Sequence, residues 1–374
     1  MNFTLSSEQQ LLKDSVERFV ADHYDLEKRN ALVDSDVGFS KDNWKAMAEL
    51  GWLALPFAEA DGGFGGGVVE TMLLMESFGK GLVVEPYLAS IVLGGGALKR
   101  GGTKTLKDAF LPGVIDGSKQ LALAYAEVQS RFDLEDIATS ARADGDAFVV
   151  NGTKSVVLNA ATATQIVVAT RTSGGQIDAN GVTLLLVDAN APGIERKDYP
   201  TVDGLRASEV TFTNVRVPKE RVLGEVGRGF GILQAVANDA ILALSAEAVG
   251  AMEVLYKDTV AYTQERKQFG HPLADFQVLQ HRMVEMFMEY EQCKSLLYRA
   301  TLEASTAALS AQRTIHALKH LVGRAGTFIA ENAVQLHGGM GMTEELRIGH
   351  YFKRLIVIDT QFGNTDHHLQ KFAA

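Results

Sequence analysis

The feature that most constrains the fold is a long apolar seam in the last third of this 374-residue chain. Seven residues recur at alternating steps of three and four: Phe276, Leu279, Met283, Met286, Tyr290, Cys293 and Leu297. This spacing places them on one face of a helix, as at helix–helix interfaces. A second helical stripe contains Ile315, Leu318, Val322, Ala325, Ile329 and Leu336. We therefore expect residues 229–374 to form a four-helix bundle in which the methionines are packing residues.

The first third of the chain also has a helical pattern. It opens with a capping-box signal at Ser6 or Ser7, and further helices are expected over 42–50, 69–79 and 87–100. Between them, the segment 61–67 carries five glycines, which break any helix. Their spacing fits neither a P-loop nor a dinucleotide-binding fingerprint, so we interpret this segment as an inter-helix loop. Residues 1–117 are predicted to be an N-terminal helical domain.

Near Lys119 the hydrophobic period falls from about 3.6 residues to about 2 and β-branched residues become frequent, which is typical of strands. Strands are expected over 165–171, 181–187 and 209–217. Asn151–Gly152 predicts a two-residue hairpin turn between two further strands, and Asp144–Gly145 predicts another turn just before it. Residues 118–228 should form a small β-barrel or sandwich, which makes the whole chain an α+β protein of three domains.

Composition narrows the classes of partner. The net charge of −10 and the absence of basic runs disfavour nucleic acid and anionic membranes. Cys293 is the only cysteine, so no intramolecular disulfide or thiolate metal cluster can form. His367 and His368 are adjacent and do not share a helix face, so we interpret them as part of a polar C-terminal segment. With no secretion signal at Met1 and no run of membrane-spanning length, we expect a cytoplasmic protein.

The stretch Gln264–Pro272 reads as a helix end, with cations, a glycine and then a proline. Arg266 and Phe269 are three residues apart, so both are expected to lean from one face of the final helical turn. The planar guanidinium can donate two hydrogen bonds to a diphosphate. The alternative interpretation is a solvated last turn with a core phenylalanine.

Three ordered motifs carry a family resemblance: Glu265–Gly270, Phe276–His281 and Gln335–Met342. They follow one another as in the acyl-CoA dehydrogenases, and the chain is identified as resembling that family along essentially its whole length. A finer similarity, to the small subunits of pimeloyl-CoA dehydrogenases, is carried by three other segments: Val83–Leu88, Gln129–Asp133 and His350–Leu355.

The resemblance implies α,β-dehydrogenation of an acyl-CoA thioester, with electron-transfer flavoprotein as acceptor. A carboxylate removes the α proton while a hydride leaves the β carbon for FAD. By motif, Arg266 and Phe269 would contact the pyrophosphate and adenine side of FAD. Gln335, Gly338 and Gly339 would contact the same ADP portion, where glycines allow close backbone approach. In this family these groups reach FAD held mainly by a neighbouring subunit, so the resemblance also implies an oligomer.

The chain departs from the family at the catalytic base. The usual glutamate position near the C-terminus is Phe362, and a phenyl ring cannot accept a proton. The alternative glutamate position of some relatives corresponds to Ala240, followed by Ile241 where many relatives carry arginine. Asp239 is the nearest carboxylate and is our candidate base, although a one-residue offset turns a side chain by about 100° around a helix.

A second departure concerns the flavin ring. The family's Thr-Glu-Pro-Gly-x-Gly-Ser-Asp segment appears as Ala126–Asp133, which places Ala126 and Phe132 where hydroxyls are expected. The Trp-x-Thr element appears as Val156–Leu158. Three interpretations follow. The chain is one half of an α2β2 heterotetramer with a homologous large subunit, or a self-sufficient homotetramer with a relocated base, or a non-catalytic structural homologue.

Overall fold

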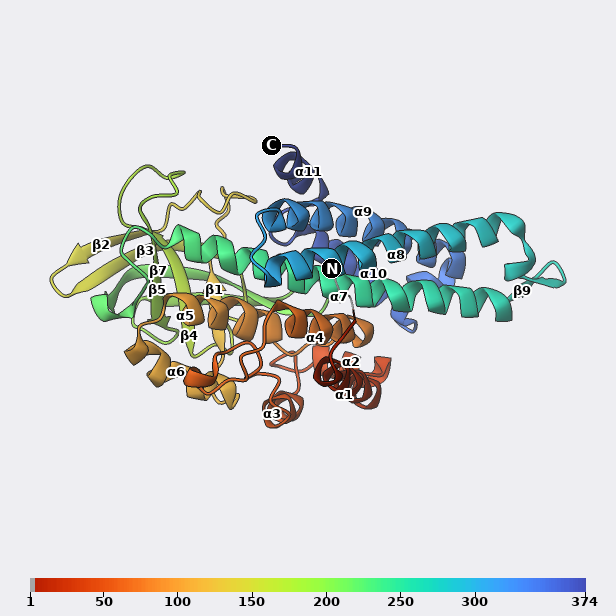
Figure 1. Cartoon of the computed structure of the whole chain (residues 1–374), viewed down its shortest axis with the longest axis horizontal. Coiled ribbons are helices and arrows are strands. Elements are labelled where there is room, and N and C mark those ends of the chain that lie inside the picture. Colours follow the sequence, from red (N-terminus) through yellow and green to blue (C-terminus); the bar gives the residue numbers. More distant parts are fainter. Residues whose placement is uncertain (1–3) are drawn as a thin grey trace. The chain divides into compact units, whose positions relative to one another are not determined.

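Figure 1 shows the computed structural model of the chain, which describes residues 4–374. The chain divides into two compact units. The bundle unit contains the described residues of Met1–Ala31, together with Gly67–Val83 and Ile241–Ala374. The sheet unit contains Leu32–Gly66 and Val84–Ala240. Each unit therefore combines segments that are far apart in sequence.

The bundle unit is built from helices. They are α1 (Ser7–His23), α4 (Val68–Gly81), most of α7 (Phe230–Glu265), α8 (Gln277–Ser305), α9 (Ala311–His337), α10 (Arg347–Thr360) and α11 (Thr365–Ala373). The predicted Ser6 capping box is present, because Ser6 and Gln9 exchange side-chain–backbone hydrogen bonds. Short α2 (Leu26–Val33) follows α1.

The two apolar stripes predicted in the last third are the core of the bundle unit. On α8 the seam is buried from Met283 to Leu297, and on α9 all six stripe residues are buried. The methionines at 283 and 286 pack there as expected. Cys293 is also buried, and burial raises the pKa of its thiol.

The sheet unit contains one eight-stranded sheet in the order β6-β7-β3-β2-β4-β5-β8, with β1 pairing parallel to β4. Its strands are β1 (Leu121–Ala124), β2 (Ser140–Asp144), β3 (Ala147–Leu158), β4 (Gln165–Arg171), β5 (Val182–Asp188), β6 (Ile194–Pro200), β7 (Arg206–Pro218) and β8 (Val222–Leu223). The expected strands over 165–171, 181–187 and 209–217 correspond to β4, β5 and β7. The fold class, helices followed by a β region and then helices, is confirmed.

The prediction of a hairpin turn at Asn151–Gly152 is wrong. Strand β3 runs through these residues, and its hairpin with β2 turns at Gly145, where the second predicted turn lies. Gly152 instead lies at a bulge where β3 pairs with β7. A side chain at Gly152 would come within 2.5 Å of the Thr139 hydroxyl, so glycine is needed for packing rather than for turning the chain.

The helical prediction for the first third holds with one change of helix type. Helices α3 (Lys41–Glu49) and α4 lie within one or two residues of expectation, and segment 61–67 is an inter-helix loop. The segment expected to be helical over 87–100 begins as a π-helix (Leu88–Gly95) and continues as α5 (Gly96–Gly101), before α6 (Lys104–Ile115). The boundaries proposed after residues 117 and 228 stay predictions.

Helix α7 is the only helix in residues 4–374 that is long and apolar enough to cross a membrane. Of its most apolar 18-residue window, 72% is buried inside the protein. This burial is typical of the core helix of a folded domain.

Candidate functional site

The first predicted cofactor-binding segment lies just beyond the C-terminal end of α7. The helix stops at Glu265, and Lys267–Gln268 (β9) then pairs antiparallel with His271–Pro272 (β10). Phe269 is therefore at a hairpin tip and not on the final helical turn, so the expectation that it shares a helix face with Arg266 is wrong. Closure of the hairpin is reinforced by the Leu273 amide, which donates to the Arg266 carbonyl at 2.8 Å.

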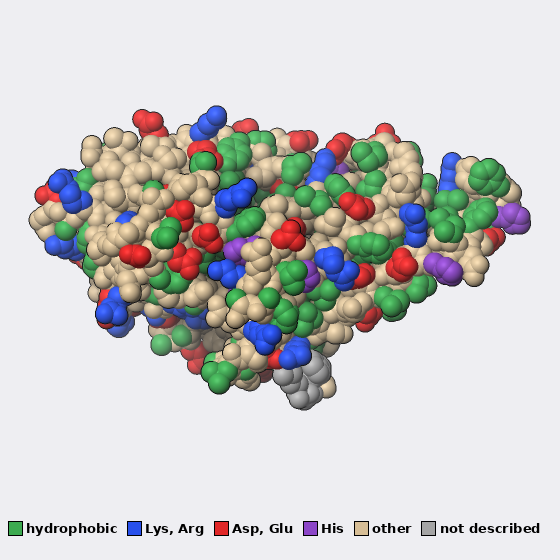
Figure 2. Space-filling view, turned by 90° about the horizontal axis from the view of Figure 1, so that it is seen from above, with side chains coloured by type: hydrophobic (Ala, Val, Ile, Leu, Met, Phe, Trp, Pro, Cys, Tyr) green, Lys and Arg blue, Asp and Glu red, His purple; other side chains and the backbone are tan. Residues whose placement is uncertain are grey.

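The tip of this hairpin is a conformation that few phenylalanines adopt. Phe269 has φ +53° and Gly270 has φ +84°, the two left-handed residues of a tight hairpin turn. The Phe269 side chain is 90% exposed. Hydrophobic side chains are visible at the right-hand end of Figure 2, where this hairpin lies. The ring meets Phe276 edge-on, with centroids 6.4 Å apart, but neither burial nor the turn conformation favours a phenylalanine here.

The second predicted segment lies at the C-terminal end of α9. Gln335 is exposed in the last turn, and the helix ends at His337, before the short 3-10 helix Gly338–Met342. Gly338 has φ +62° and ψ −142°, a conformation almost restricted to glycine. A Cβ atom built at Gly338 or Gly339 would meet no described atom within 4 Å. The backbone at these two glycines is therefore open to close approach from outside.

We call these two segments, which the family resemblance predicts to contact the ADP portion of FAD, the Arg266 arm (Arg266–Gly270) and the Gln335 arm (Gln335–Gly339). Among residues 4–374, the Arg266 guanidinium and the Gln335 side-chain amide make no hydrogen bond or ion pair, and both residues are exposed. A free planar guanidinium can receive a diphosphate, and an exposed phenyl ring can stack on a base. The structure thus leaves the donor groups available.

The segment that should face the flavin ring has a different character. The Glu127 carboxylate is buried and pairs with the buried Lys154 ammonium at 2.6 Å. It also accepts from the amides of Ala138 and Thr139, at 2.9 and 3.0 Å. Burial opposes ionisation of this carboxyl, but the Lys154 ammonium, together with hydrogen bonds from Gln129 and Thr139, outweighs it and lowers the pKa of Glu127 to about 2. This carboxylate is fully used within the sheet unit.

The remaining groups of Ala126–Asp133 are no better suited to a flavin ring. The Ser130 hydroxyl is buried and exchanges hydrogen bonds with the Glu127 backbone. The neighbouring Val128 is 83% exposed. In this segment the apolar Val128 is exposed to solvent, whereas the Ser130 hydroxyl is buried and hydrogen-bonded to the backbone.

Val156, in the element aligned with Trp-x-Thr, lies in a bulge of β3. It has φ +52°, which is unfavourable for a β-branched residue, and its side chain is half exposed. The bulge is held by Glu209, which accepts from the Ser155 hydroxyl at 2.9 Å and from the Tyr199 hydroxyl at 3.0 Å. The bulge therefore exposes the Val156 side chain at the position where the family pattern has a tryptophan.

Phe362, at the family's base position, is buried in the turn between α10 and α11, with φ +56°. Its carbonyl accepts from the His368 ring at 2.9 Å. The Lys319 ammonium, which is fully buried, donates to the carbonyls of Asp359 and Gly363. This turn is fixed by internal hydrogen bonds. His368 is buried within it, so our interpretation of a polar C-terminal segment is wrong at this residue.

Asp239, the candidate base, lies in the part of α7 that belongs to the sheet unit. Its carboxylate pairs with the Arg100 guanidinium at 2.5 Å. Burial raises the pKa of the Asp239 carboxyl, and the positive charge of Arg100 partly offsets this rise. Ala240 beside it is buried. The carboxylate is thus held by an ion pair, and its role as a base stays a prediction.

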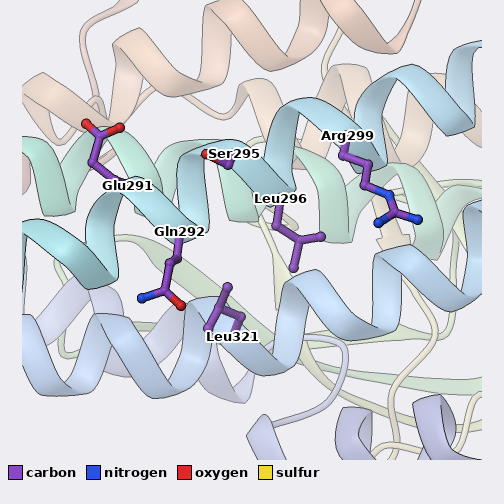
Figure 3. A pocket seen from close by; sticks show the side chains of 6 residues that line it. All are labelled: Glu291, Gln292, Ser295, Leu296, Arg299 and Leu321. Atoms are coloured by element: carbon purple, nitrogen blue, oxygen red, sulfur yellow. The ribbon is translucent and has the colours of Figure 1, made fainter. Parts of the chain in front are cut away.

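An open hollow of about 470 Å³ lies between α8 and α9. In Figure 3, Gln292 and Leu296 extend from α8 toward Leu321 of α9. None of the predicted site residues lines it, and we assign it no role in the site.

Two contacts near the predicted residues were not foreseen from sequence. One is the Glu127–Lys154 ion pair, and the other is a stack of Tyr262 on His337, with ring centroids 4.2 Å apart. Each joins residues at least 27 positions apart, so no local pattern could have revealed it.

Family models of the acyl-CoA dehydrogenases match nearly the whole chain. The N-terminal domain model matches residues 6–118, the middle domain model 122–215 and the C-terminal domain model 227–374. Probable acyl-CoA dehydrogenase YngJ of Bacillus subtilis is 29% identical over 350 residues, which cover 92% of this chain and 91% of that protein. Caffeyl-CoA reductase-Etf complex subunit CarC of Acetobacterium woodii is 27% identical over 326 residues, 86% of each chain.

Solved structures of similar proteins have the same fold as this chain. The Tcur3481-Tcur3483 steroid ACAD variant has a TM-score of 0.89 and 28% identity, covering 99% of this chain and 98% of that one. The FAD complex of PigA has a TM-score of 0.92 and 26% identity, covering 100% and 98%. The chain therefore belongs to the acyl-CoA dehydrogenase family of FAD-dependent oxidoreductases.

Proposed function

We propose that this chain is one subunit of a heteromeric, FAD-dependent acyl-CoA dehydrogenase and supplies the ADP-side half of a FAD site. A homologous larger subunit would hold the flavin ring, the acyl-CoA and the catalytic glutamate. The expected assembly is an α2β2 heterotetramer. The segments that resemble the small subunits of pimeloyl-CoA dehydrogenases support the same arrangement.

The observation that carries this proposal is the contrast between the two halves of the FAD site. On the ADP side, the Arg266 guanidinium is exposed and unpaired within residues 4–374, and Phe269 is 90% exposed on a left-handed turn. On the flavin-ring side, the Glu127 carboxylate forms a buried ion pair with Lys154, and the Val128 side chain is exposed to solvent. Simple loss of function would not spare the ADP side preferentially.

Each residue of the two arms has a defined task in this proposal. The Arg266 fork would donate two hydrogen bonds to the diphosphate, and Phe269 would pack on the adenine side. Gln335 would donate or accept at the ADP portion, and the open backbone of Gly338 and Gly339 would allow the cofactor to approach closely. FAD bound there supplies a hydride acceptor for the β carbon of an acyl-CoA thioester.

The absence of a base at position 362 supports the same division of labour. Phe362 is buried and its turn is held by Lys319 and His368, so no proton acceptor stands at this position. Under the proposal the proton is taken by the glutamate of the larger subunit. The relative named as a subunit of an Etf complex supports electron-transfer flavoprotein as the electron acceptor.

The decisive experiment is to isolate this chain from its native host with whatever accompanies it, and to measure flavin per chain. We expect a homologous second chain and one FAD per pair of chains. The isolated chain alone should bind FAD weakly and show no acyl-CoA dehydrogenase activity. One tightly bound FAD per chain, with activity, would overturn the proposal in favour of a homotetramer. An Arg266→Ala complex that binds FAD as well as the unmodified complex would indicate a purely structural homologue.

A further inference from the structure

The two arms of the ADP half-site come from different helices and need something to hold them in register. The Arg266 arm follows α7 and the Gln335 arm ends α9, and some seventy residues separate them in sequence. Both arms belong to the bundle unit. A diphosphate held by one arm while the backbone of the other approaches it requires a fixed distance between them.

A single aromatic contact joins the bases of the two arms. Tyr262 lies one turn before Arg266, and the Arg266 amide donates to the Tyr262 carbonyl at 2.9 Å. The Tyr262 ring stacks on the His337 ring at 4.2 Å with an interplanar angle of 25°. His337 is the last residue of α9 and directly precedes Gly338. The stack therefore links the last turn of α7 to the last residue before the Gly338 turn.

A hydrogen bond accompanies the stack. The Tyr262 hydroxyl donates to the His337 carbonyl at 3.4 Å. This carbonyl belongs to the C-terminal end of α9, where carbonyls lack helical partners. It is also the carbonyl of the peptide that leads into Gly338, so the bond acts on the turn itself.

The other face of His337 is fixed as well. Its Nδ1 lies 2.8 Å from the Ala333 carbonyl, which can only accept, so Nδ1 carries the proton. Burial lowers the pKa of the His337 ring and favours its neutral form. The imidazole is thereby held between the backbone of its own helix and the Tyr262 ring, and it cannot turn without breaking one contact.

We infer that Tyr262 and His337 are positioning residues, which set the Arg266 arm against the Gln335 arm so that both reach one ADP moiety. This inference rests on the proposed function of the two arms. The pair would not touch FAD. Its loss should misplace the arms while leaving their own side chains intact.

The test uses the assembled complex with FAD removed and then titrated back, with binding followed by flavin fluorescence. Tyr262→Leu removes both stack and hydroxyl, and we expect FAD affinity to fall about tenfold, the scale of one charge-assisted hydrogen bond. Tyr262→Phe keeps the stack and should lose less. The matched control is Tyr256→Leu, because Tyr256 lies on the same helix but packs on Phe287 and Tyr290 of α8. This control should leave FAD affinity unchanged at a similar cost in thermal stability.

A double variant separates positioning from simple packing. If Tyr262 acts through Arg266, then Arg266→Ala should cost less affinity in the Tyr262→Leu background than in the unmodified protein. Strictly additive losses, or equal effects of Tyr262→Leu and Tyr256→Leu, would overturn the inference. An Arg266→Ala variant without effect would instead overturn the proposed function, so the two failures are distinguishable.

Discussion

The buried ion pair between Glu127 and Lys154 offers the sharpest test of how the ring-side segment is held. The Nζ–Oε1 distance is 2.6 Å, and the two side chains are 4% and 0% exposed. Replacing Lys154 with methionine removes the cation but keeps most of the volume. It leaves a buried carboxylate that still accepts from the backbone amides of Ala138 and Thr139 and from the Gln129 side chain but has no countercharge. This should cost about 3 to 5 kcal/mol in the free energy of unfolding.

The pKa shifts of the two partners oppose each other. The pKa of Glu127 falls from 4.5 to about 2, whereas burial lowers the pKa of Lys154 to about 8, so the intact pair contributes less stability than the Glu127 shift alone would indicate. Because the pKa of Glu127 is lowered in the folded state, its contribution is fully present above pH 4.5 and is lost as pH falls through about 2. In Lys154→Met the carboxyl lacks its cation, so burial should raise its pKa above the unfolded value. The stability deficit of this variant should therefore shrink as the pH is lowered from 7 toward 4.

The assay is urea-induced unfolding at several pH values, followed by circular dichroism and by proteolysis of the segment Ala126–Asp133. Lys154→Met combined with Glu127→Gln is the matched control, because a neutral amide still accepts from the Thr139 amide and should recover much of the loss. A loss below about 1 kcal/mol in the single variant is the size expected for an exposed pair, and would refute the argument. A deficit that grows toward low pH would refute it too.

Three further predictions concern the arms, the bulge and the buried histidine. Arg266→Lys keeps the charge but loses the planar fork, so FAD affinity of the complex should fall about tenfold, by flavin titration, with an unchanged melting temperature; equal affinity would contradict a bidentate role. Val156→Gly should raise the free energy of unfolding by about 1 kcal/mol, because glycine tolerates φ +52°, whereas Val157→Gly in the buried core should lower it. Burial and nearby cations lower the pKa of His368 from 6.5 to about 3, so between these pH values the unfolded chain binds more protons than the folded one. The free energy of unfolding should therefore decrease as the pH is lowered through this range. His368→Gln should flatten that part of the unfolding profile, and an unaltered profile would exclude this source.

The helices and strands that could be predicted from sequence are those set by local burial patterns. The stripes on α8 and α9 repeat with the helical period, and the strand Gln165–Arg171 is a short, almost fully buried run that contains β-branched residues, so a single sequence window is enough for each. Gly152 misled because its role depends on Thr139 and on pairing with the distant β7. The π-helix at Leu88–Gly95 also has no local signature in the apolar pattern.

The candidate site divides in the same way. Motif order named Arg266 and Gln335, and the departures at Phe362 and Ala126 were readable from the residues alone. Geometry was not. The cation, glycine and proline pattern that marks helix ends predicted Phe269 on a helix. In the structure the short strands β9 and β10 pair on either side of it, so Phe269 lies at a hairpin tip. Tyr262, which stacks on His337, lies on another helix, and no spacing rule connects the two residues.

The hairpin tip at Phe269 has a consequence for how such a protein must be produced. The Phe269 ring meets Phe276 edge-on but is 90% exposed on a left-handed residue, so it buries little surface in the free chain and favours association with other chains. Chains made in excess of a binding partner would expose this ring to one another and to the proteins that recognise unfolded chains. Synthesis in step with a partner removes that hazard. Under the proposed heteromeric assembly, co-expression with the larger subunit should therefore raise the soluble yield of this chain.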